Sequence, residues 1–320
     1  MRLFALRRAA HCCSGAGIGE GPGGRPDAAV TQGIRHLIER DDGTWQLPFH
    51  RYAAAVADEI SLTFLGTGTS VGVPVIGCGC AVCRSADPKN RRLRSSVLLR
   101  FGVLSLLVDS GPDLRQQALR EGLRQLDGVL YTHAHLDHVA GFDDLRAFCW
   151  RRSEPLPMHA TAECLASLKQ MFGWAFAPDN VHQGYVKPDA RVVDGAFCYG
   201  ALRVTPLPVV HAAMETIGYL FEPAGARSLA YLPDVKRIPP ATMELLRGVD
   251  VLVLDALRPA PHDTHFSLGE ALAAAAASGA AETWLTHLGH ENEHAELTEA
   301  LPPGVRVAWD GLKVSLAGLA

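Results

Sequence analysis

Three histidines and one aspartate lie within six residues near the middle of the chain, in the stretch His133-Ala134-His135-Leu136-Asp137-His138. Neutral imidazole and ionised carboxylate are ligands that divalent zinc, manganese and iron accept in proteins. The apolar run at residues 128–130 predicts a short buried strand before the stretch, and residues 139–148 indicate a helix after it. The four side chains would then converge at a strand-to-helix turn. We therefore expect a metal site here rather than three unrelated surface histidines.

Three later predicted strands end at residues of the same kind. Strands at residues 202–208, 228–232 and 283–286 lead into His211, Asp234 and His287, respectively. A core strand buries its length and can present a polar side chain at its end, at the rim of the sheet. Seven ligands are too many for one ion, but two ions can share them if one carboxylate bridges. One group would be His133, His135, His211 and Asp234, and the other Asp137, His138, Asp234 and His287.

The rest of the pattern predicts alternating strands and helices from residue 60 onward. Apolar runs predict further strands at residues 61–65, 96–101, 104–108, 156–159, 216–221, 249–254, 305–308 and 312–316. Helical periodicity predicts helices at residues 113–121, 161–172, 240–247, 267–278 and 291–300, with Ser267 as a favourable N-cap. Residues 174–189 are expected to form a loop.

A second cluster of metal-binding residue types is the thiol loop, residues 78–83, which contains Cys78, Cys80 and Cys83. Three thiols at this spacing can surround one zinc ion, but a fourth ligand is missing locally. His290 lies three residues after His287, so the same sheet rim could bring it to the thiols as a closed Cys3His site. The alternative is reduced thiols without metal. Bunched cysteines in a large His-rich chain suit a reducing compartment, so we expect a cytoplasmic protein.

Two loops near these clusters have compositions that suggest anion binding. Residues 66–70 are Gly-rich, but neither a P-loop nor a dinucleotide-binding fingerprint fits, because no Gly-Lys-Ser/Thr and no helical pattern follow. We interpret them as a tight turn near the metals, with backbone N–H groups free for an anionic substrate. Arg91, Arg92 and Arg94 could form a wall for a phosphate substrate, and an ordinary solvated loop is the alternative.

Taken together, these residues resemble the metallo-β-lactamase fold, whose pattern is His-x-His-x-Asp-His followed by His, Asp and His on later strands. The resemblance spans roughly residues 60–316. It implies an α/β fold, namely an αββα four-layer sandwich of two mixed β-sheets with the metals along one edge. It also implies that Asp109 lies behind a ligand histidine and orients it. Residues 60–320 would then form one hydrolase domain.

Asp234 and the thiol loop narrow the branch of the family. The lactam-cleaving members with two zincs usually have Cys at the position of Asp234, whereas a bridging carboxylate suits two close metals that clamp a phosphate ester. The chain is most similar to the phosphoribosyl 1,2-cyclic phosphate phosphodiesterases of the phosphonate pathway, including residues 205–208, 218–220 and 310–311. The resemblance implies two zinc or manganese ions, one structural zinc, and a hydroxide attacking a small cyclic phosphodiester. Asp137 would orient this nucleophile, and His265 would be the general acid.

Four alternatives stay open. A thioester or other acyl hydrolase could use the same dinuclear centre. The pyrroloquinoline-quinone biosynthesis protein of this fold has the thiol loop and a motif like residues 112–117, but departs from the dinuclear pattern. The RNA-processing endonuclease branch shares all seven ligands, yet we find no comparable basic arm. A non-enzymatic metal carrier is the fourth.

Composition limits the partners. The chain has 320 residues, 48% hydrophobic, with a net charge of −4, which gives no electrostatic reason to expect nucleic acid. No apolar stretch approaches the ~20 residues that span a bilayer. We expect a small phosphodiester partner, no membrane, and a homodimer.

Residues 1–59 look like a disordered extension, with an organellar transit peptide as the alternative because Arg2, Arg7 and Arg8 precede the first acid. Short helices are expected there at residues 34–39 and 52–58.

Overall fold

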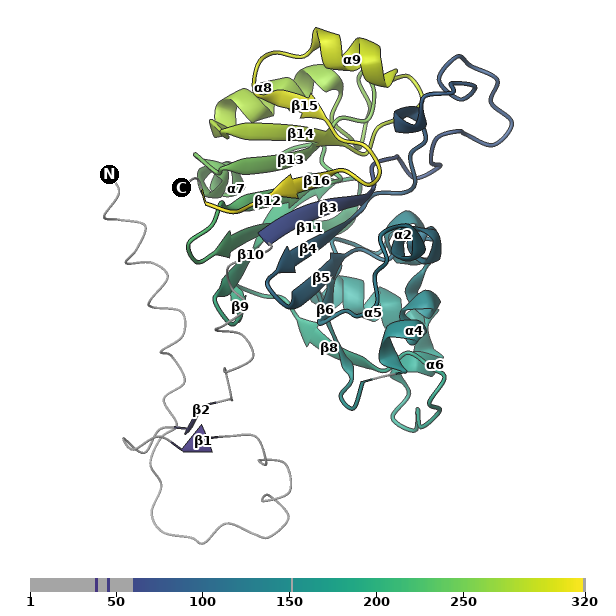
Figure 1. Cartoon of the computed structure of the whole chain (residues 1–320), viewed down its shortest axis with the longest axis vertical. Coiled ribbons are helices and arrows are strands. Elements are labelled where there is room, and N and C mark those ends of the chain that lie inside the picture. Colours follow the sequence, from purple (N-terminus) through teal and green to yellow (C-terminus); the bar gives the residue numbers. More distant parts are fainter. Residues whose placement is uncertain (1–37, 40–44, 47–59, 151, 319–320) are drawn as a thin grey trace, which may run out of the picture.

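The computed structural model describes residues 38–39, 45–46, 60–150 and 152–318 (Figure 1). The expectations of a disordered extension or transit peptide, and of a helix at residues 52–58, lie outside these residues. β1 (Ile38–Glu39) pairs antiparallel with β2 (Trp45–Gln46), so the helix expected at residues 34–39 is wrong at its described end.

Two seven-stranded sheets form the centre of the molecule. The first contains, in spatial order, β16 (Lys313–Ser315), β3 (Ile60–Gly66), β4 (Ser96–Phe101), β5 (Leu104–Val108), β6 (Gly128–Leu130), β7 (Leu156–Ala160) and β8 (Pro188–Val192). The second contains β15 (Val305–Val307), β14 (Glu282–Thr286), β13 (Val251–Asp255), β12 (Leu229–Leu232), β11 (Met214–Pro223), β10 (Leu202–His211) and β9 (Phe197–Tyr199). Both sheets mix parallel and antiparallel pairs, as expected.

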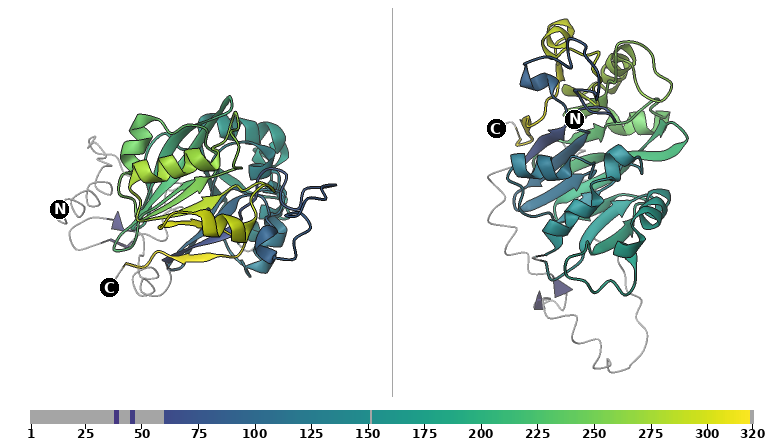
Figure 2. Two further views of the ribbon diagram at one scale, coloured as in Figure 1. Left: turned by 90° about the horizontal axis from the view of Figure 1, so that it is seen from above. Right: turned by 90° about the vertical axis from the view of Figure 1, so that its right-hand side faces the viewer.

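Helices cover the outer face of each sheet (Figures 1 and 2). Those on the first sheet are α2 (Leu114–Arg120), α3 (Leu136–Val139), η3 (Phe142–Leu145), α4 (Arg146–Cys149), α5 (Ala162–Met171) and α6 (Gly173–Phe176). Those on the second sheet are α7 (Pro240–Leu246), α8 (Leu268–Ser278) and α9 (His294–Ala300), and the 3-10 turn η2 (Pro88–Asn90) precedes β4. The predicted αββα sandwich is confirmed, and no described helix is long and apolar enough to cross a bilayer.

The central strands are apolar on both faces because each sheet is covered on both sides. On β13, Val251 and Val253 belong to the core between the sheets, whereas Leu252 and Leu254 pack under the helices. Alternate residues of a strand point to opposite faces, so a continuous apolar run is what a doubly covered strand requires. Each fully buried aliphatic side chain stabilises the fold by roughly 1.5–3 kcal/mol. This packing makes the strand ends fixed positions for polar side chains.

Parallel pairing sets which strand ends meet. β12, β13 and β14 are parallel neighbours, with Leu232 beside Leu254 and Asp255 beside Thr286. The residues that follow β12 and β14 therefore reach the same edge of the second sheet. The first sheet is tied to this edge by a hydrogen bond from the Ile217 backbone N–H to the Thr132 carbonyl, 3.0 Å long.

Candidate metal centre

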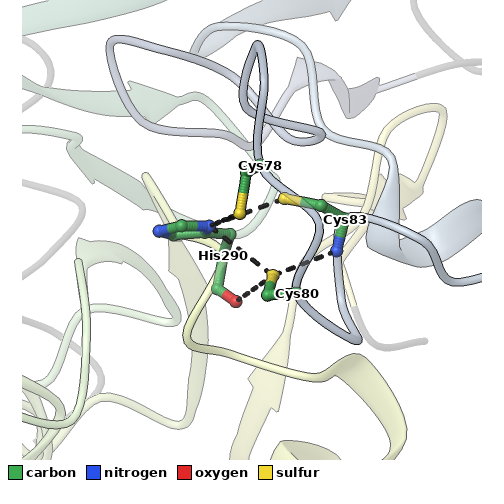
Figure 3. A group of neighbouring side chains, drawn as sticks. All are labelled: Cys78, Cys80, Cys83 and His290. Carbon is green, nitrogen blue, oxygen red and sulfur yellow. Dashed lines mark hydrogen bonds between the residues drawn. The ribbon is translucent and has the colours of Figure 1, made fainter.

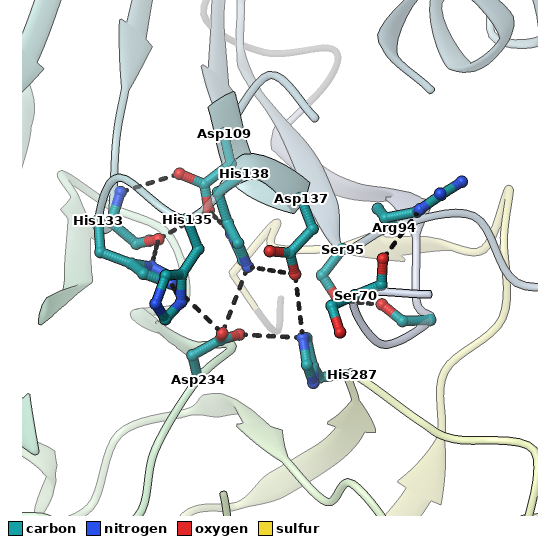
Figure 4. A network of polar contacts seen from close by, with 12 residues as sticks. Ser70, Arg94, Ser95, Asp109, His133, His135, Asp137, His138, Asp234 and His287 are labelled. Carbon is teal, nitrogen blue, oxygen red and sulfur yellow. Dashed lines mark hydrogen bonds and ion pairs between the residues drawn. The ribbon is translucent and has the colours of Figure 1, made fainter. Parts of the chain in front are cut away.

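The seven ligand candidates converge in the two groups expected from the sequence. His133, His135, His211 and Asp234 each offer a ligand atom within 4.8 Å of the others, and Asp137, His138, Asp234 and His287 do the same. Most of these side chains are buried. Figure 4 shows six of them pointing toward one another, namely His133, His135, Asp137, His138, Asp234 and His287.

Asp234 belongs to both groups, and its two carboxylate oxygens face different histidines. Its Oδ2 lies 3.5 Å from His133 Nε2 and 3.3 Å from His138 Nε2. Its Oδ1 lies 3.3 Å from His287 Nε2. A single carboxylate in this position can contribute one oxygen to each of two cations.

The cluster straddles the end of an extended segment and the start of a helix. α3 begins at Leu136, three residues earlier than the expected helix, so Asp137 and His138 lie in its first turn and His135 is its N-cap. The single helix expected over residues 139–148 is wrong, because the chain forms three short helical pieces instead. The close approach of Gly141 to the Gly111 carbonyl, 2.0 Å from where a Cβ would lie, accompanies this break.

Asp109 has the place that the resemblance implied for it. Its fully buried Oδ2 accepts a hydrogen bond from His138 Nδ1, 2.8 Å long, and another from the Thr132 hydroxyl, 2.9 Å long. Its Oδ1 accepts from the Thr132 backbone N–H. Because Nδ1 of His138 donates here, Nε2 is the nitrogen that faces the carboxylates and that would offer its lone pair to a cation once its proton is displaced. Asp109 has a φ of 64°, an uncommon conformation that clusters at functional sites.

Two further positioning contacts were not predicted from the sequence. The imidazole of His211 donates from Nδ1 to the Thr264 carbonyl over 2.8 Å. The imidazole of His265 donates from Nδ1 to Asp255 Oδ2, also over 2.8 Å. Asp255 ends the buried strand β13, so the strand-end signal that indicated Asp234 would have indicated it as well.

His265 lies beside the ligand candidates. Its ring stacks on that of His287 with centroids 4.7 Å apart, and its centroid lies 4.6 Å from that of His211. Nδ1 is held by Asp255, so Nε2 is the nitrogen left for other chemistry. The structure thus brings His265 to the centre, and its acid role stays a proposal.

The buried donor set fits divalent cations. His138 Nε2, both ring nitrogens of His287 and Asp234 Oδ1 have no hydrogen-bond partner, and each such buried orphan costs about 1–3 kcal/mol. Burial would raise the pKa of Asp234, but the surrounding imidazoles outweigh it and hold the pKa well below its usual range. Burial lowers the pKa of His211 to about 4. Ionised carboxylate and neutral imidazole are the forms that bind metal.

His138 and His287 are the exceptions in protonation. Burial would lower the pKa of His138, but the Asp234, Asp109 and Asp137 carboxylates outweigh it and raise the pKa well above its usual range. The same balance holds for His287. Burial acts to lower the pKa of its imidazole, but the Asp234 and Asp137 carboxylates outweigh burial and raise it to about 9. Without a cation His287 therefore carries a proton at neutral pH. A metal binding to this half of the centre must displace that proton, so its affinity should rise with pH.

The thiol loop and His290 form a second convergent group (Figure 3). His290 Nδ1 lies 3.3, 3.6 and 3.5 Å from the sulfurs of Cys78, Cys80 and Cys83, respectively. The Cys83 backbone N–H is the main group that lowers the pKa of the Cys80 thiol, to about 6, which favours the thiolate that binds zinc. Three sulfurs around one imidazole nitrogen fit a closed tetrahedral zinc site better than unconnected thiols.

The expected phosphate wall is wrong for Arg92. This residue is 1% exposed, and its guanidinium donates to the carbonyls of Gly289 and Asn292. Arg94 is partly exposed near the centre, where its guanidinium pairs with Asp113 and donates to the Ser70 carbonyl. Arg91 is exposed on the surface. Sequence could not separate these three, because adjacent cationic residues give no sign of which one turns inward.

The Gly-rich loop also differs from expectation. The backbone N–H of Gly68 donates to the Leu93 carbonyl and that of Thr69 to the Leu288 carbonyl, so neither is free for a substrate. Its glycines allow close backbone approach instead. A Cβ on Gly66 would lie 2.0 Å from the Arg94 carbonyl oxygen, a distance that no side chain could tolerate.

Comparison with known proteins gives a family match and a sequence relative. Residues 105–288 match the family model described as a beta-lactamase superfamily domain. An octanoyltransferase of Porphyromonas gingivalis is 37% identical over 259 residues, which is 78% of this chain and 50% of that protein. The chain therefore spans about half the length of this relative.

Two solved structures are similar over most of the chain. A diphosphatase of the PhnP family shares 40% identity with a TM-score of 0.74, over 81% of this chain and 98% of that one. Zinc-bound PqqB of Methylobacterium extorquens shares 25% identity with a TM-score of 0.66, over 80% of this chain and 100% of that one.

Proposed function

Because the chain belongs to the β-lactamase superfamily of metal-dependent hydrolases, we propose that it is a dinuclear phosphodiesterase acting on a small cyclic phosphodiester. The observation that carries the proposal is the position of Asp234, whose Oδ2 faces His133 and His138 while its Oδ1 faces His287. Two metals that share a carboxylate lie close together, as clamping both oxygens of a phosphate ester requires. The similarity to a diphosphatase over nearly that whole protein supports phosphorus chemistry.

The residues that would hold the two cations, zinc or manganese, are His133, His135, His211 and Asp234 on one side and Asp137, His138, Asp234 and His287 on the other. Cations bound there would lower the pKa of a water molecule and offset the charge that develops on the phosphate oxygens. Cys78, Cys80, Cys83 and His290 would hold one structural zinc.

The chain's own side chains would then orient the nucleophile and move protons. Asp137 is partly accessible, and its Oδ2 lies 3.3 Å from His138 Nε2, so this carboxylate at the centre could accept a hydrogen bond from the attacking water and align it. His265 would donate a proton from Nε2 to the departing alkoxide, with Asp255 holding its other nitrogen. Of the three arginines, Arg94 is the candidate for a phosphate contact, and its guanidinium would have to leave Asp113 and turn toward the centre to make it.

An acyl hydrolase is the second candidate, and the observation that favours it is the octanoyltransferase relative. The match covers 50% of that protein, so the acyl transfer in its name is not assigned to the shared half. The same cations and the same nucleophile would serve an acyl carbonyl.

A substrate panel with metal analysis separates these functions. The full chain, loaded with zinc or manganese, would be assayed on a cyclic nucleotide, bis(nitrophenyl) phosphate, a dinucleoside diphosphate and an acyl-glutathione. We expect turnover of the phosphorus esters, and a loss of roughly 10³-fold or more in Asp234→Ala, where the cations lose their shared ligand. Turnover of the thioester alone would favour the acyl hydrolase. Metal-replete protein inert on all four would favour a metal carrier.

A further inference from the structure

Arg92 joins two parts of the molecule that each carry metal-ligand candidates. Its guanidinium donates from Nη1 to the Gly289 carbonyl over 3.1 Å and from Nη2 to the Asn292 carbonyl over 2.7 Å. Its backbone pairs with Val73 through hydrogen bonds of 2.9 and 2.8 Å, at the base of the thiol loop. A buried arginine whose two terminal nitrogens are both hydrogen-bonded is a rigid connection, because freeing it would leave charged and polar groups unpaired.

The segment that Arg92 holds carries one ligand candidate for each cluster. We name residues 287–290 the linking segment: His287 faces Asp234 at one end, and His290 faces the three thiols at the other. Between them, the Leu288 backbone N–H donates to the Thr67 carbonyl over 2.8 Å. Only two residues separate the histidines, so the segment cannot shift at one end and stay in place at the other.

The backbone of His287 is held in an unfavourable conformation. Its φ is 56°, in the left-handed region, which costs a residue with a side chain about 1–3 kcal/mol and persists only when neighbours impose it. Its ring nitrogens make no hydrogen bond with the described residues, and its side chain has only ion-pair distances such as the 3.3 Å to Asp234 and the stacking on His265. The position of His287 therefore depends on the contacts of the linking segment, among them those to Arg92.

The thiol loop has little apolar packing to hold it. Val73, Val82 and Cys83 are the buried members of a small separate cluster, and Ile76 nearby is 97% exposed. The loop is joined to the linking segment by the approach of its sulfurs to His290 and by Arg92. A cation at the thiols would fix this junction, and its loss would release it.

We propose that the Cys3His site and the half of the dinuclear centre that contains His287 bind their metals cooperatively, with Arg92 as the positioning residue that couples them. The inference rests on the metal binding proposed above. Ordering the linking segment for one cation lowers the cost of ordering it for the other. Loss of a contact behind a metal ligand typically lowers affinity about 10–100-fold, and this is the size of effect expected. The coupling must be equal in both directions, because it is a property of binding free energies.

Cobalt(II) titration of the full chain tests the coupling, because thiolate ligation gives a near-ultraviolet charge-transfer band that imidazole and carboxylate ligation lack. In Cys80→Ser, we expect the affinity for one ion of the dinuclear centre to fall at least about tenfold, with the ion on the His133 side unaffected. In His287→Ala, the charge-transfer band should require a cobalt concentration higher by the same factor.

Arg92→Gln supplies the direct test of the positioning residue. It should weaken the coupling while leaving the charge-transfer band itself intact. Arg152→Gln is the matched control, because Arg152 also donates to a backbone carbonyl, that of Leu126, away from both clusters. If Arg92→Gln does not fold, the Cys80→Ser and His287→Ala pair still decides the matter. If cobalt binds at both places with independent affinities, the coupling is overturned and the metal sites stand. If no cobalt binds at the thiols, both the structural zinc site and the coupling are overturned.

Discussion

Hydrogen bonds behind the histidines select which ring nitrogen faces the carboxylates. His138 donates from Nδ1 to Asp109, and His211 donates from Nδ1 to the Thr264 carbonyl. A neutral imidazole whose proton is on Nδ1 has its lone pair on Nε2, where a cation can use it. These backing contacts therefore prepare each ring for metal before any metal arrives.

Asp109→Asn should change this tautomer while preserving the shape of the side chain. Three donors converge on the Asp109 carboxylate, from His138 Nδ1, the Thr132 hydroxyl and the Thr132 backbone N–H. An amide has one accepting oxygen, so one donor would face its NH2 group. We expect affinity for the ion on the His138 side to fall about 10–100-fold, measured by isothermal titration with zinc.

Asp127→Asn is the control for Asp109→Asn. Asp127 is a partly buried carboxylate that accepts from the Ser105 backbone N–H, far from both clusters. It should lower stability without changing zinc affinity. Equal zinc affinity in Asp109→Asn and the wild type would show that Asp109 does not prepare the ligand.

His265→Ala tests the proposed acid through the leaving group. Turnover of an alkoxide-releasing phosphodiester should fall about 10²–10⁴-fold, whereas a nitrophenolate leaves without protonation and should be affected far less. His262→Ala is the matched control, since its ring lies 5.3 Å from that of His265 but its Nδ1 is paired with Thr264 instead of Asp255. Equal losses on the two substrates in His265→Ala would remove this residue from the acid role.

Sequence predicted most of the candidate site because its signal is local. The His133 to His138 stretch needs no knowledge of the fold, and His211, Asp234 and His287 follow recognisable strands. Asp255 was missed as a site residue because its partner, His265, is ten residues away across a loop. Arg92 was wrongly assigned because its burial depends on carbonyls about 200 positions further along the chain.

At the scale of elements, the centre depends on how closely the turn after β5 packs against α3. A Cβ on Gly111 would lie 2.1 Å from the Asp137 carbonyl oxygen. Gly111→Ala should therefore push α3 away, destabilising the fold by about 1–3 kcal/mol and weakening metal binding. Urea denaturation and zinc titration measure the two effects.

Gly173→Ala is the control for Gly111→Ala. Gly173 begins α6, and nothing lies within 4 Å of where its Cβ would be. Its replacement should leave stability and metal affinity unchanged or slightly raise stability. A Gly111→Ala variant that matched Gly173→Ala in both measurements would contradict the packing argument.

The cap of α8 makes stability depend on pH. Burial would raise the pKa of Glu270, but Lys236 and the Ser267 backbone N–H and hydroxyl outweigh it and lower the pKa to about 2. Since the folded pKa lies below the usual 4.5, the contribution is complete above pH 4.5 and is lost as pH falls toward 2. Glu270→Gln should cost about 0.5 kcal/mol at pH 7, a small value because the carboxylate is partly exposed.

Urea denaturation at pH 7 and pH 3 checks this prediction. The difference in the free energy of unfolding between the wild type and Glu270→Gln should shrink at pH 3, where the carboxylate begins to take up a proton. Glu299→Gln, at the exposed end of α9, should show no gap at either pH. A Glu270→Gln gap that stayed constant would mean that the charge does not stabilise the cap.

Elements with strong local patterns were predicted well, and weak ones were missed. The N-cap Ser267 and the helix after it are confirmed, with a complete capping box. α6 and the first two residues of β8 overlap the segment 174–189 that was expected to be a loop, and neither the rest of β8 nor β9 was predicted. β8 is mostly exposed and β9 has three residues, so neither shows the alternating apolar pattern that predicts a strand.

At the scale of the whole molecule, the centre is a joint between the two sheets. The first sheet supplies the residues from His133 to His138, and the second supplies His211, Asp234 and His287. The Tyr219 hydroxyl, from the second sheet, donates to the Tyr131 carbonyl of the first over 2.8 Å. Cations held by both sheets would stabilise the sandwich as a unit. Neither sheet alone supplies a complete set of ligands for either cation.

Anomalous diffraction from crystals of the full chain grown with zinc tests the central claim most directly. We expect two anomalous peaks flanking Asp234, about 3.5–4 Å apart, and a third peak among Cys78, Cys80, Cys83 and His290. A single peak among the histidines, or two peaks that do not share Asp234, would contradict it.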